Sequence, residues 1–417
     1  MSRPNTPVTN VPGIRFPACR HAKKQRGKVA TKAAWLAGEP YRLFFLTGAL
    51  FSIAGVLMWP AFFRLEIGGY PGIAHARVMA TAFIGAFIVG FLGTAGPRMM
   101  GAPRLCPGEL AAFLSLHLAS GLSYLTGRVA AGDVLFLLLL AGFALSLGVR
   151  FAVLRKELPP PSMLLAATGL ACGIAGTLMW VVPGWIATTD QHRFAGMLVY
   201  QGFPLAPVMG VGVFFFPRLL GGDFGEPESP RETGRLTLAM ALAALVLVAS
   251  FVADAWWHRP TGLLMRAGAF AFVLAHVRWR SAPGAPPVGT LGNALRFVCI
   301  PLALAGFVVT AFAETRLAGL MHLLYATGFG LVCLIAASRV LFGHSGMIER
   351  FADRSWAARL IVAGVVIAAF TRLSADFLPR VMISHLEYAA WTWVLAAGGW
   401  LLWHGKRFYH GSNRLNH

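Results

Sequence analysis

Long apolar segments recur along almost the whole chain, and they limit the folds that it can adopt. A helix needs about 20 mostly apolar residues to cross the hydrocarbon core of a bilayer. Only helices and closed barrels satisfy their backbone hydrogen bonds there. The pattern predicts an all-α, polytopic integral membrane helical bundle of about 12 transmembrane helices. The expected spans are joined by short connectors rich in Pro and Gly, and they lie at 41–63, 73–96, 108–126, 131–153, 163–186, 194–217, 235–254, 261–278, 295–313, 317–342, 356–375 and 384–404.

The distribution of Lys and Arg predicts the orientation of this bundle. Positively charged residues are retained in cytoplasmic loops. With the N-terminus inside, most of the 36 Lys and Arg residues fall on the cytoplasmic side, so both termini are expected in the cytoplasm. In a soluble protein the net charge of +20 would indicate nucleic acid, but here the basic residues alternate with apolar segments. We therefore expect a lipid bilayer, and no nucleic acid, as a partner.

The two ends of the chain differ from its apolar middle. Residues 1–40 are basic and rich in Pro, and no apolar stretch of the kind found in a cleavable signal peptide precedes Tyr41. They are expected to form a basic disordered cytoplasmic arm, followed by a twelve-span transmembrane domain at 41–404 and a cytoplasmic tail at 405–417. The five cysteines are dispersed without CxxC spacing, so they indicate neither a zinc site nor a disulfide framework.

Four histidines lie at the outer ends of the predicted spans. His75 opens the second span, His322 lies just inside the tenth, and His192 and His385 lie at the starts of the sixth and twelfth. Imidazole is costly to leave unpaired in hydrocarbon, and it is the usual protein ligand of haem iron and copper. Histidines from separate helices in one layer therefore indicate a redox or metal cofactor. His344 is about 33 Å further along the tenth helix than His322, so it is expected at the inner face.

The second, sixth and tenth spans end alike on the inner side. Their ends carry Arg98, Arg218 and Arg339, and a proline precedes the first two of these, at Pro97 and Pro217. The spacing corresponds to one four-helix unit each time, which predicts three four-helix repeats with these spans in equivalent places. The alternative is that arginines at inner ends simply follow from the positive-inside rule. If the repeat holds, the outer ends of the same three spans converge.

Several stretches resemble the NnrS family, bacterial inner-membrane proteins of the nitric-oxide response that contain haem and copper. The resemblance runs from about residue 41 to 404 and is most specific at residues 75–79 (HARVM) and 339–346 (RVLFGHSG). The chain departs from the family pattern where Arg77 replaces a second histidine, Val78 a glutamate and Met347 an arginine. The layout is also similar, as an analogy of fold, to the catalytic subunit of haem–copper oxidases, in which spans 2 and 10 supply haem ligands.

The resemblance and the residues together predict a haem site near the outer face. His75 and His322 are expected to be the axial ligands of a b-type haem, because separate helices can place imidazoles on opposite faces of one porphyrin. Hydrogen bonds to a carbonyl or a headgroup are the alternative. Met79, one turn past His75, is a further candidate ligand, with packing as the alternative. Arg77 and Arg316 are expected to pair with haem propionates, unless they are plain outer-loop charges.

Copper is the second cofactor that the resemblance implies. His192 and His385, with Tyr200, are the candidates for a copper site, although no two histidines of the chain have adjacent or i,i+4 spacing. His344 is expected to cap the tenth span or to contact Arg339. Four further motif residues lie at inner span ends and have no assigned role: Arg339, Gly343, Arg98 and Pro97.

Three functions are compatible with these features. The first is a haem-containing inner-membrane protein of the nitric-oxide or nitrosative-stress response, which binds NO or transfers electrons near the outer face, with a quinol or cytochrome as donor. The second is a cofactor-free twelve-span permease for a small solute, and the third a membrane nitric-oxide reductase or oxidase. All 16 carboxylates lie in connectors or within about two turns of a span end, which disfavours a proton-coupled carrier. The residues identify no catalytic group.

Overall fold

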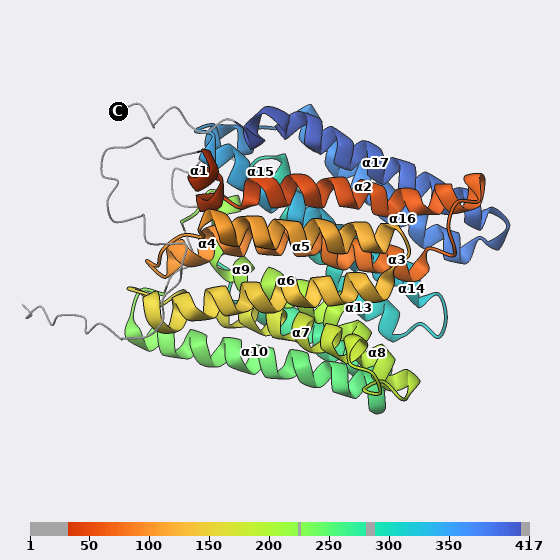
Figure 1. The fold of residues 1–417 in the computed structure, drawn as a ribbon, viewed down its shortest axis with the longest axis horizontal. Coiled ribbons are helices and arrows are strands. Elements are labelled where there is room, and N and C mark those ends of the chain that lie inside the picture. Colours follow the sequence, from red (N-terminus) through yellow and green to blue (C-terminus); the bar gives the residue numbers. More distant parts are fainter. Residues whose placement is uncertain (1–31, 224–226, 281–287, 410–417) are drawn as a thin grey trace, which may run out of the picture.

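The computed structural model describes residues 32–223, 227–280 and 288–409, and these are almost entirely helical, without a strand among them. The all-α bundle predicted from the sequence is confirmed. Within the described residues, the helices join into twelve long rods, which run side by side in Figure 1. The rods are α2 (Tyr41–Leu65); α3 (Gly72–Arg77), continuing through Val78–Ile84 into α4 (Gly85–Met99); α5 (Pro107–Leu125); α6 (Val129–Val149); α7 (Met163–Val181); α8 (Thr189–Met197), continuing through Leu198–Gly202 into α9 (Phe203–Leu219); α10 (Pro230–Trp256); α11 (Arg259–Leu274); α12 (Thr290–Ala294), continuing through Leu295–Cys299 into α13 (Ile300–Ala311); α14 (Leu317–His322), continuing through Leu323–Leu331 into α15 (Val332–His344); α16 (Trp356–Phe377); and α17 (Met382–His404).

Glycines in the left-handed backbone conformation end three of these rods. Gly101, Gly127 and Gly221 have φ angles of 57°, 74° and 80° and follow α4, α5 and α9 by two residues each. A residue with a side chain adopts this conformation at a cost, whereas glycine does so freely and lets the chain leave the helix axis. The turns let the following rods run back along the bundle.

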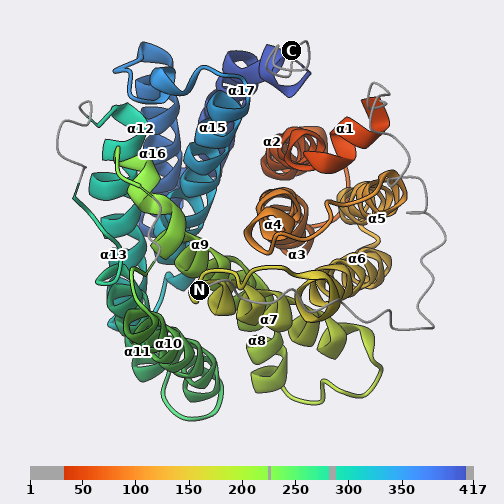
Figure 2. The same cartoon turned by 90° about the vertical axis from the view of Figure 1, so that its left-hand side faces the viewer.

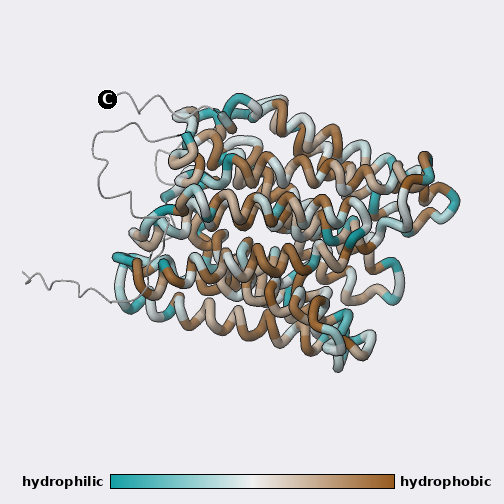
Figure 3. The backbone as a smooth tube through the Cα atoms, viewed as in Figure 1, coloured by the Kyte–Doolittle hydropathy of each residue, from teal (hydrophilic) through white to brown (hydrophobic). Residues whose placement is uncertain are grey.

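Nine rods of the described chain are long and apolar enough to cross a membrane, which identifies a membrane protein. The three that do not meet this measure are α5, α11 and α17. Helix α11 is short, while α5 and α17 carry more polar and aromatic residues. Helices α5 and α17 nevertheless run alongside the other rods in Figure 1. The count of twelve spans therefore stays a prediction. Apolar residues dominate the middle of the rods, and hydrophilic residues gather at their ends (Figure 3).

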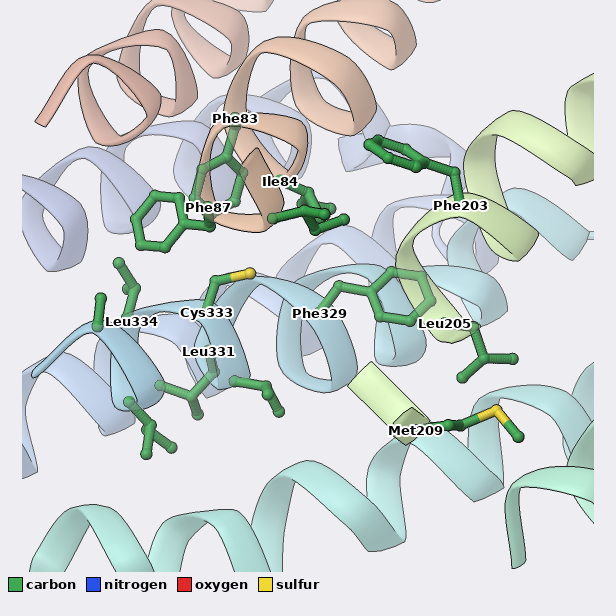
Figure 4. Packing of buried hydrophobic residues seen from close by; sticks show 14 of the residues in the cluster. Phe83, Ile84, Phe87, Phe203, Leu205, Met209, Phe329, Leu331, Cys333 and Leu334 are labelled. Atoms are coloured by element: carbon green, nitrogen blue, oxygen red, sulfur yellow. The ribbon is translucent and has the colours of Figure 1, made fainter. Parts of the chain in front are cut away.

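Three rods form the centre of the bundle. In α3–α4, α8–α9 and α14–α15, 83%, 83% and 78% of the most apolar window is buried, against 28–50% in the other six spans. Figure 2 shows the remaining helices around them, and Figure 4 shows their side chains packed together, Phe83 and Phe87 from the first, Phe203 from the second and Phe329 from the third. Each of the three contains a π-helical stretch, a distortion that often occurs at functional sites. These are the three spans that were predicted to occupy equivalent places, and the repeat itself stays a prediction.

The described ends of the chain lie together at one end of the bundle, which we call the terminal end; the other is the distal end (Figure 1). The predicted disordered arm finishes in a helix, α1 (Lys32–Gly38), in which Ala37 is buried and Trp35 lies under the Arg42 guanidinium at 4.4 Å. Residues 1–31 lie outside the described chain. Of the predicted tail, Gly405–Phe408 form a short helical turn with Phe408 buried, and residues 410–417 are not described.

Candidate cofactor site

An apolar cavity of about 490 Å³ lies at the distal end, between the rods α2, α3–α4, α14–α15, α16 and α17. This volume falls in the usual range of ligand pockets, about 300–1,000 Å³. Aromatic side chains contribute much of its wall. The polar side chains among its lining residues are few: His75, Tyr70, Tyr200, His322, Tyr325 and Arg372. The cavity brings His75 and His322, predicted from the sequence to share one site, to a common wall.

His75 is held by helix α2, which packs closely against the helix that carries it. The Nδ1 atom of His75 lies 2.9 Å from the carbonyl oxygen of Gly55. A Cβ atom at position 55 would come within 2.8 Å of Val78 and 3.0 Å of the Met79 sulfur, so the approach requires glycine. Met79 also lines the cavity, as its position one turn after His75 predicts.

His322 is oriented in the same way by a carbonyl of its own helix. Its Nδ1 atom lies 2.6 Å from the carbonyl oxygen of Ala318, one turn earlier in α14. A carbonyl oxygen only accepts hydrogen bonds, so in both histidines Nδ1 carries the proton and Nε2 keeps its lone pair. This carbonyl contact was the alternative to ligation, but it is equally the contact that orients a ligating histidine. Both side chains therefore have the tautomer that a metal ligand needs.

Arg77 does not line the cavity, although it lies at the same level. Its guanidinium binds Asp133 through Nε at 2.8 Å and Nη2 at 3.2 Å, and it stacks 3.2 Å above the ring of Trp180. It also donates to the hydroxyl of Tyr200, which does line the cavity. Arg77 and Asp133 are 4% and 5% exposed. The residue that replaces a family histidine is thus part of a buried ion pair.

A second buried network reaches the cavity from the other side. Arg266 contacts Asp254 and the side-chain oxygen of Gln201, and the amide nitrogen of Gln201 lies 3.4 Å from the hydroxyl of Tyr325. Tyr200 and Tyr325 lie in the π-helical stretches of the second and third central rods. Arg77 of the first central rod therefore donates to Tyr200 of the second, and Gln201 of the second donates to Tyr325 of the third. These bonds fix the hydroxyl groups of the two tyrosines that line the cavity.

The remaining predicted outer residues do not meet at this cavity. Arg316 lies 4.5 Å from the ring of Phe377. His192, an exposed residue of α8, lies near Trp180, while His385 bonds the carbonyl of Val381 in α17. Helices α8 and α17 are on opposite sides of the bundle in Figures 1 and 2. Within the described chain, no three His, Cys, Asp or Glu side chains are grouped to hold a metal ion.

The inner-face motif residues lie at the terminal end, as predicted. His344 bonds Glu39 through Nδ1 at 2.9 Å and accepts from Arg98 through Nε2 at 3.2 Å. Glu39 also binds Arg42 at 2.7 Å, so this cluster joins the start of α2 to two central rods. The Nη1 atom of Arg339 lies 3.2 Å from the place that a Cβ atom of Gly343 would occupy. Pro97 is buried in the last turn of α4, next to Arg98.

Arg372 is the charged residue of the cavity lining, and the sequence did not identify it. It is one of several arginines near predicted outer span ends, and nothing in its spacing distinguishes it from Arg316 or Arg380. Its position one helical turn before Asp376 predicts an i,i+4 ion pair, which the structure contains at 2.6 Å. Which rod that pair faces depends on the rotation of α16, and a single sequence does not give this rotation.

The fold and the cavity together define a polytopic helical membrane protein with a histidine-lined apolar site at one end of its bundle. The family model described as NnrS protein matches residues 35–410, and the chain belongs to the NnrS family. Membership associates it with the nitric-oxide response at the level of the family. No curated protein matches the chain.

Proposed function

We propose that the protein is a haem-containing inner-membrane electron-transfer protein of the nitric-oxide response, with His75 and His322 as the two axial ligands. The observation that carries this proposal is their convergence. Two imidazoles from different central rods line one apolar cavity, and each has Nδ1 bonded to a backbone carbonyl. Both Nε2 lone pairs are then available for iron.

The lining of the cavity fits a haem. Trp59, Phe83 and Trp393 provide apolar and aromatic surface for a macrocycle. A haem held by two imidazoles supplies one-electron chemistry when bound.

Double ligation favours electron transfer over direct binding of NO. If His75 and His322 both held the haem iron, NO would have to displace one of them to bind there. The carbonyl contacts of both rings oppose such a displacement because they fix each ring in place. A quinol or a cytochrome is the electron donor expected for such a protein. Copper, with His192 and His385 as candidate residues, remains a separate prediction.

The test is the haem content of single variants purified in detergent. His75→Ala and His322→Ala should each lose nearly all of the haem that wild-type protein carries. His192→Ala and His385→Ala are matched controls, since both remove a histidine at the same end of the bundle but away from the cavity. Monodisperse elution of every variant establishes that the fold is retained. Normal haem content in His75→Ala and His322→Ala would refute the assignment.

A thioether variant provides a second test. Methionine also ligates haem iron, and a His/Met pair has a higher potential than a bis-His pair. His322→Met should therefore retain haem and raise its midpoint potential. A cofactor-free permease would instead give a colourless protein in wild type and in every variant.

A further inference from the structure

Arg372 introduces a permanent positive charge into the wall of the apolar cavity. Among the described residues that line the cavity, it alone carries such a charge; the others are apolar, aromatic or neutral polar. The arginine comes from α16 and shares the wall with both His75 and His322. A cation in apolar surroundings is costly unless an anion is close to it.

Asp376 fixes the position of this guanidinium against α14. Its Oδ1 accepts from Nη1 of Arg372 at 2.6 Å, and its Oδ2 accepts from the backbone N–H of Gly319 at 2.8 Å. A Cβ atom at position 319 would lie 2.6 Å from Oδ2, so glycine is required for this contact. Gly319 is one turn before His322. The Arg372–Asp376 pair is therefore docked on the same turn that carries one of the proposed ligands.

The ion pair with Asp376 leaves most N–H groups of the Arg372 guanidinium available for further hydrogen bonds. Arginine has five N–H groups in a planar fork, and Asp376 uses Nη1 alone. The side chain is 19% exposed. A free edge of the fork matches the two oxygens of a carboxylate, and a bidentate contact of this kind is stronger than a neutral hydrogen bond.

We propose that Arg372 binds a carboxylate group of the molecule held in the cavity and so sets its anionic edge beside α14 and α16. This inference rests on the proposed function, because the carboxylates it assigns to Arg372 are the propionates of the haem. Asp376 is a positioning residue that acts through Arg372. The assignment gives Arg372 the role that the sequence suggested for Arg77 and Arg316.

The experiment compares haem with its dimethyl ester, in which both carboxylates are blocked. Full-length protein freed of haem is titrated in detergent with each compound, and binding is followed by the Soret band. Wild-type protein should prefer haem by about ten-fold or more, the magnitude of a charge-assisted hydrogen bond. Arg372→Gln should lose this preference. Arg380→Gln, which removes an exposed arginine eight residues further on, should keep it.

The outcomes distinguish the role of Arg372 from the proposed haem-binding function. Equal binding of haem and ester by wild type, or an unchanged preference in Arg372→Gln, overturns the role of Arg372 and leaves His75 and His322 as proposed ligands. Binding of neither compound by wild type overturns the proposed function and this inference together. Arg372→Lys retains the charge without the fork, so it should show an intermediate preference and remain informative if Arg372→Gln does not fold. The midpoint potential is a further readout, since loss of the cation in Arg372→Gln should lower it while Arg380→Gln leaves it unchanged.

Discussion

The buried pair of Arg77 and Asp133 gives the sharpest prediction for stability. Asp133 receives two bonds from Arg77 and one from the hydroxyl of Tyr124 at 2.9 Å, and both charged groups are almost completely buried. Asp133→Leu leaves the guanidinium without its counter-ion, and Arg77→Met leaves the carboxylate with Tyr124 alone. Removing one member of a buried pair costs about 3–5 kcal/mol, so each single variant should lose that much unfolding free energy.

The double variant separates the energy of the ion pair from that of the neighbouring hydrogen bonds. Arg77→Met with Asp133→Leu removes both buried charges, so the penalty of an unpaired charge disappears. The hydroxyls of Tyr124 and Tyr200 still lose a partner, at about 1–3 kcal/mol for each group. The double variant should therefore lose about 2–6 kcal/mol, which is smaller than the sum of the two single losses by about 4 kcal/mol.

The assay is unfolding in mixed detergent micelles with increasing dodecyl sulfate, applied to all four members of the cycle. Arg193 and Asp190 form a matched control, since they are an exposed pair 3.4 Å apart. Their cycle should give about 0–1 kcal/mol. A coupling at Arg77–Asp133 no larger than that of the control pair would refute the reasoning, because it would mean that the two charges are not desolvated together.

Three further predictions concern single positions in the bundle. Burial alone would raise the pKa of Glu39, but the hydrogen bond with His344 and the charge of Arg42 outweigh it and lower the pKa to about 2 from 4.5. The ionised carboxylate therefore stabilises the fold above pH 4.5, and this contribution is lost as the pH falls towards 2. The difference in melting temperature between wild type and Glu39→Gln should shrink over that interval. A difference that stays constant would contradict this prediction. Gly210→Ala should cost about 1–3 kcal/mol, because its Cβ would lie 2.5 Å from the carbonyl oxygen of Ser162, whereas Gly148→Ala, with nothing within 4 Å, should be neutral or stabilising in the same thermal assay. His117 is fully buried with neither ring nitrogen bonded, so His117→Phe should keep or raise the melting temperature, and a marked loss would show that the imidazole has a partner.

The periodic and compositional features of the chain were sufficient to predict the helical bundle. Apolar runs located the rods, and the equal spacing of three inner-end arginines singled out the second, sixth and tenth spans, which the structure places at the centre. Because His75 and His322 lie at the same end of two of these helices, their shared cavity followed from topology. The residues that failed to reach the cavity did so for a local reason. Arg77 is two positions after His75, which corresponds to about 200° around a helix, so it faces away from the cavity.

Contacts between distant parts of the chain could not be predicted from a single sequence. His344 has Glu39 as its partner, from the connector before α2, and no pattern links the two positions. Arg372 reaches the cavity because Asp376 docks on Gly319, a contact that depends on the rotation and close approach of α16 and α14. The sequence signal for this contact is the i,i+4 spacing of Arg372 and Asp376. This spacing indicates that the two side chains pair, but not which neighbouring helix the pair faces.

A reduced-minus-oxidised optical spectrum of the purified full-length protein, with pyridine haemochrome on the same sample, decides whether His75 and His322 hold a haem. The wild-type spectrum should contain the sharp α and Soret bands of a low-spin haem, at about one haem per chain, and these bands should disappear in His75→Ala and in His322→Ala. A colourless but monodisperse wild-type protein, or unchanged bands in both variants, would contradict this assignment.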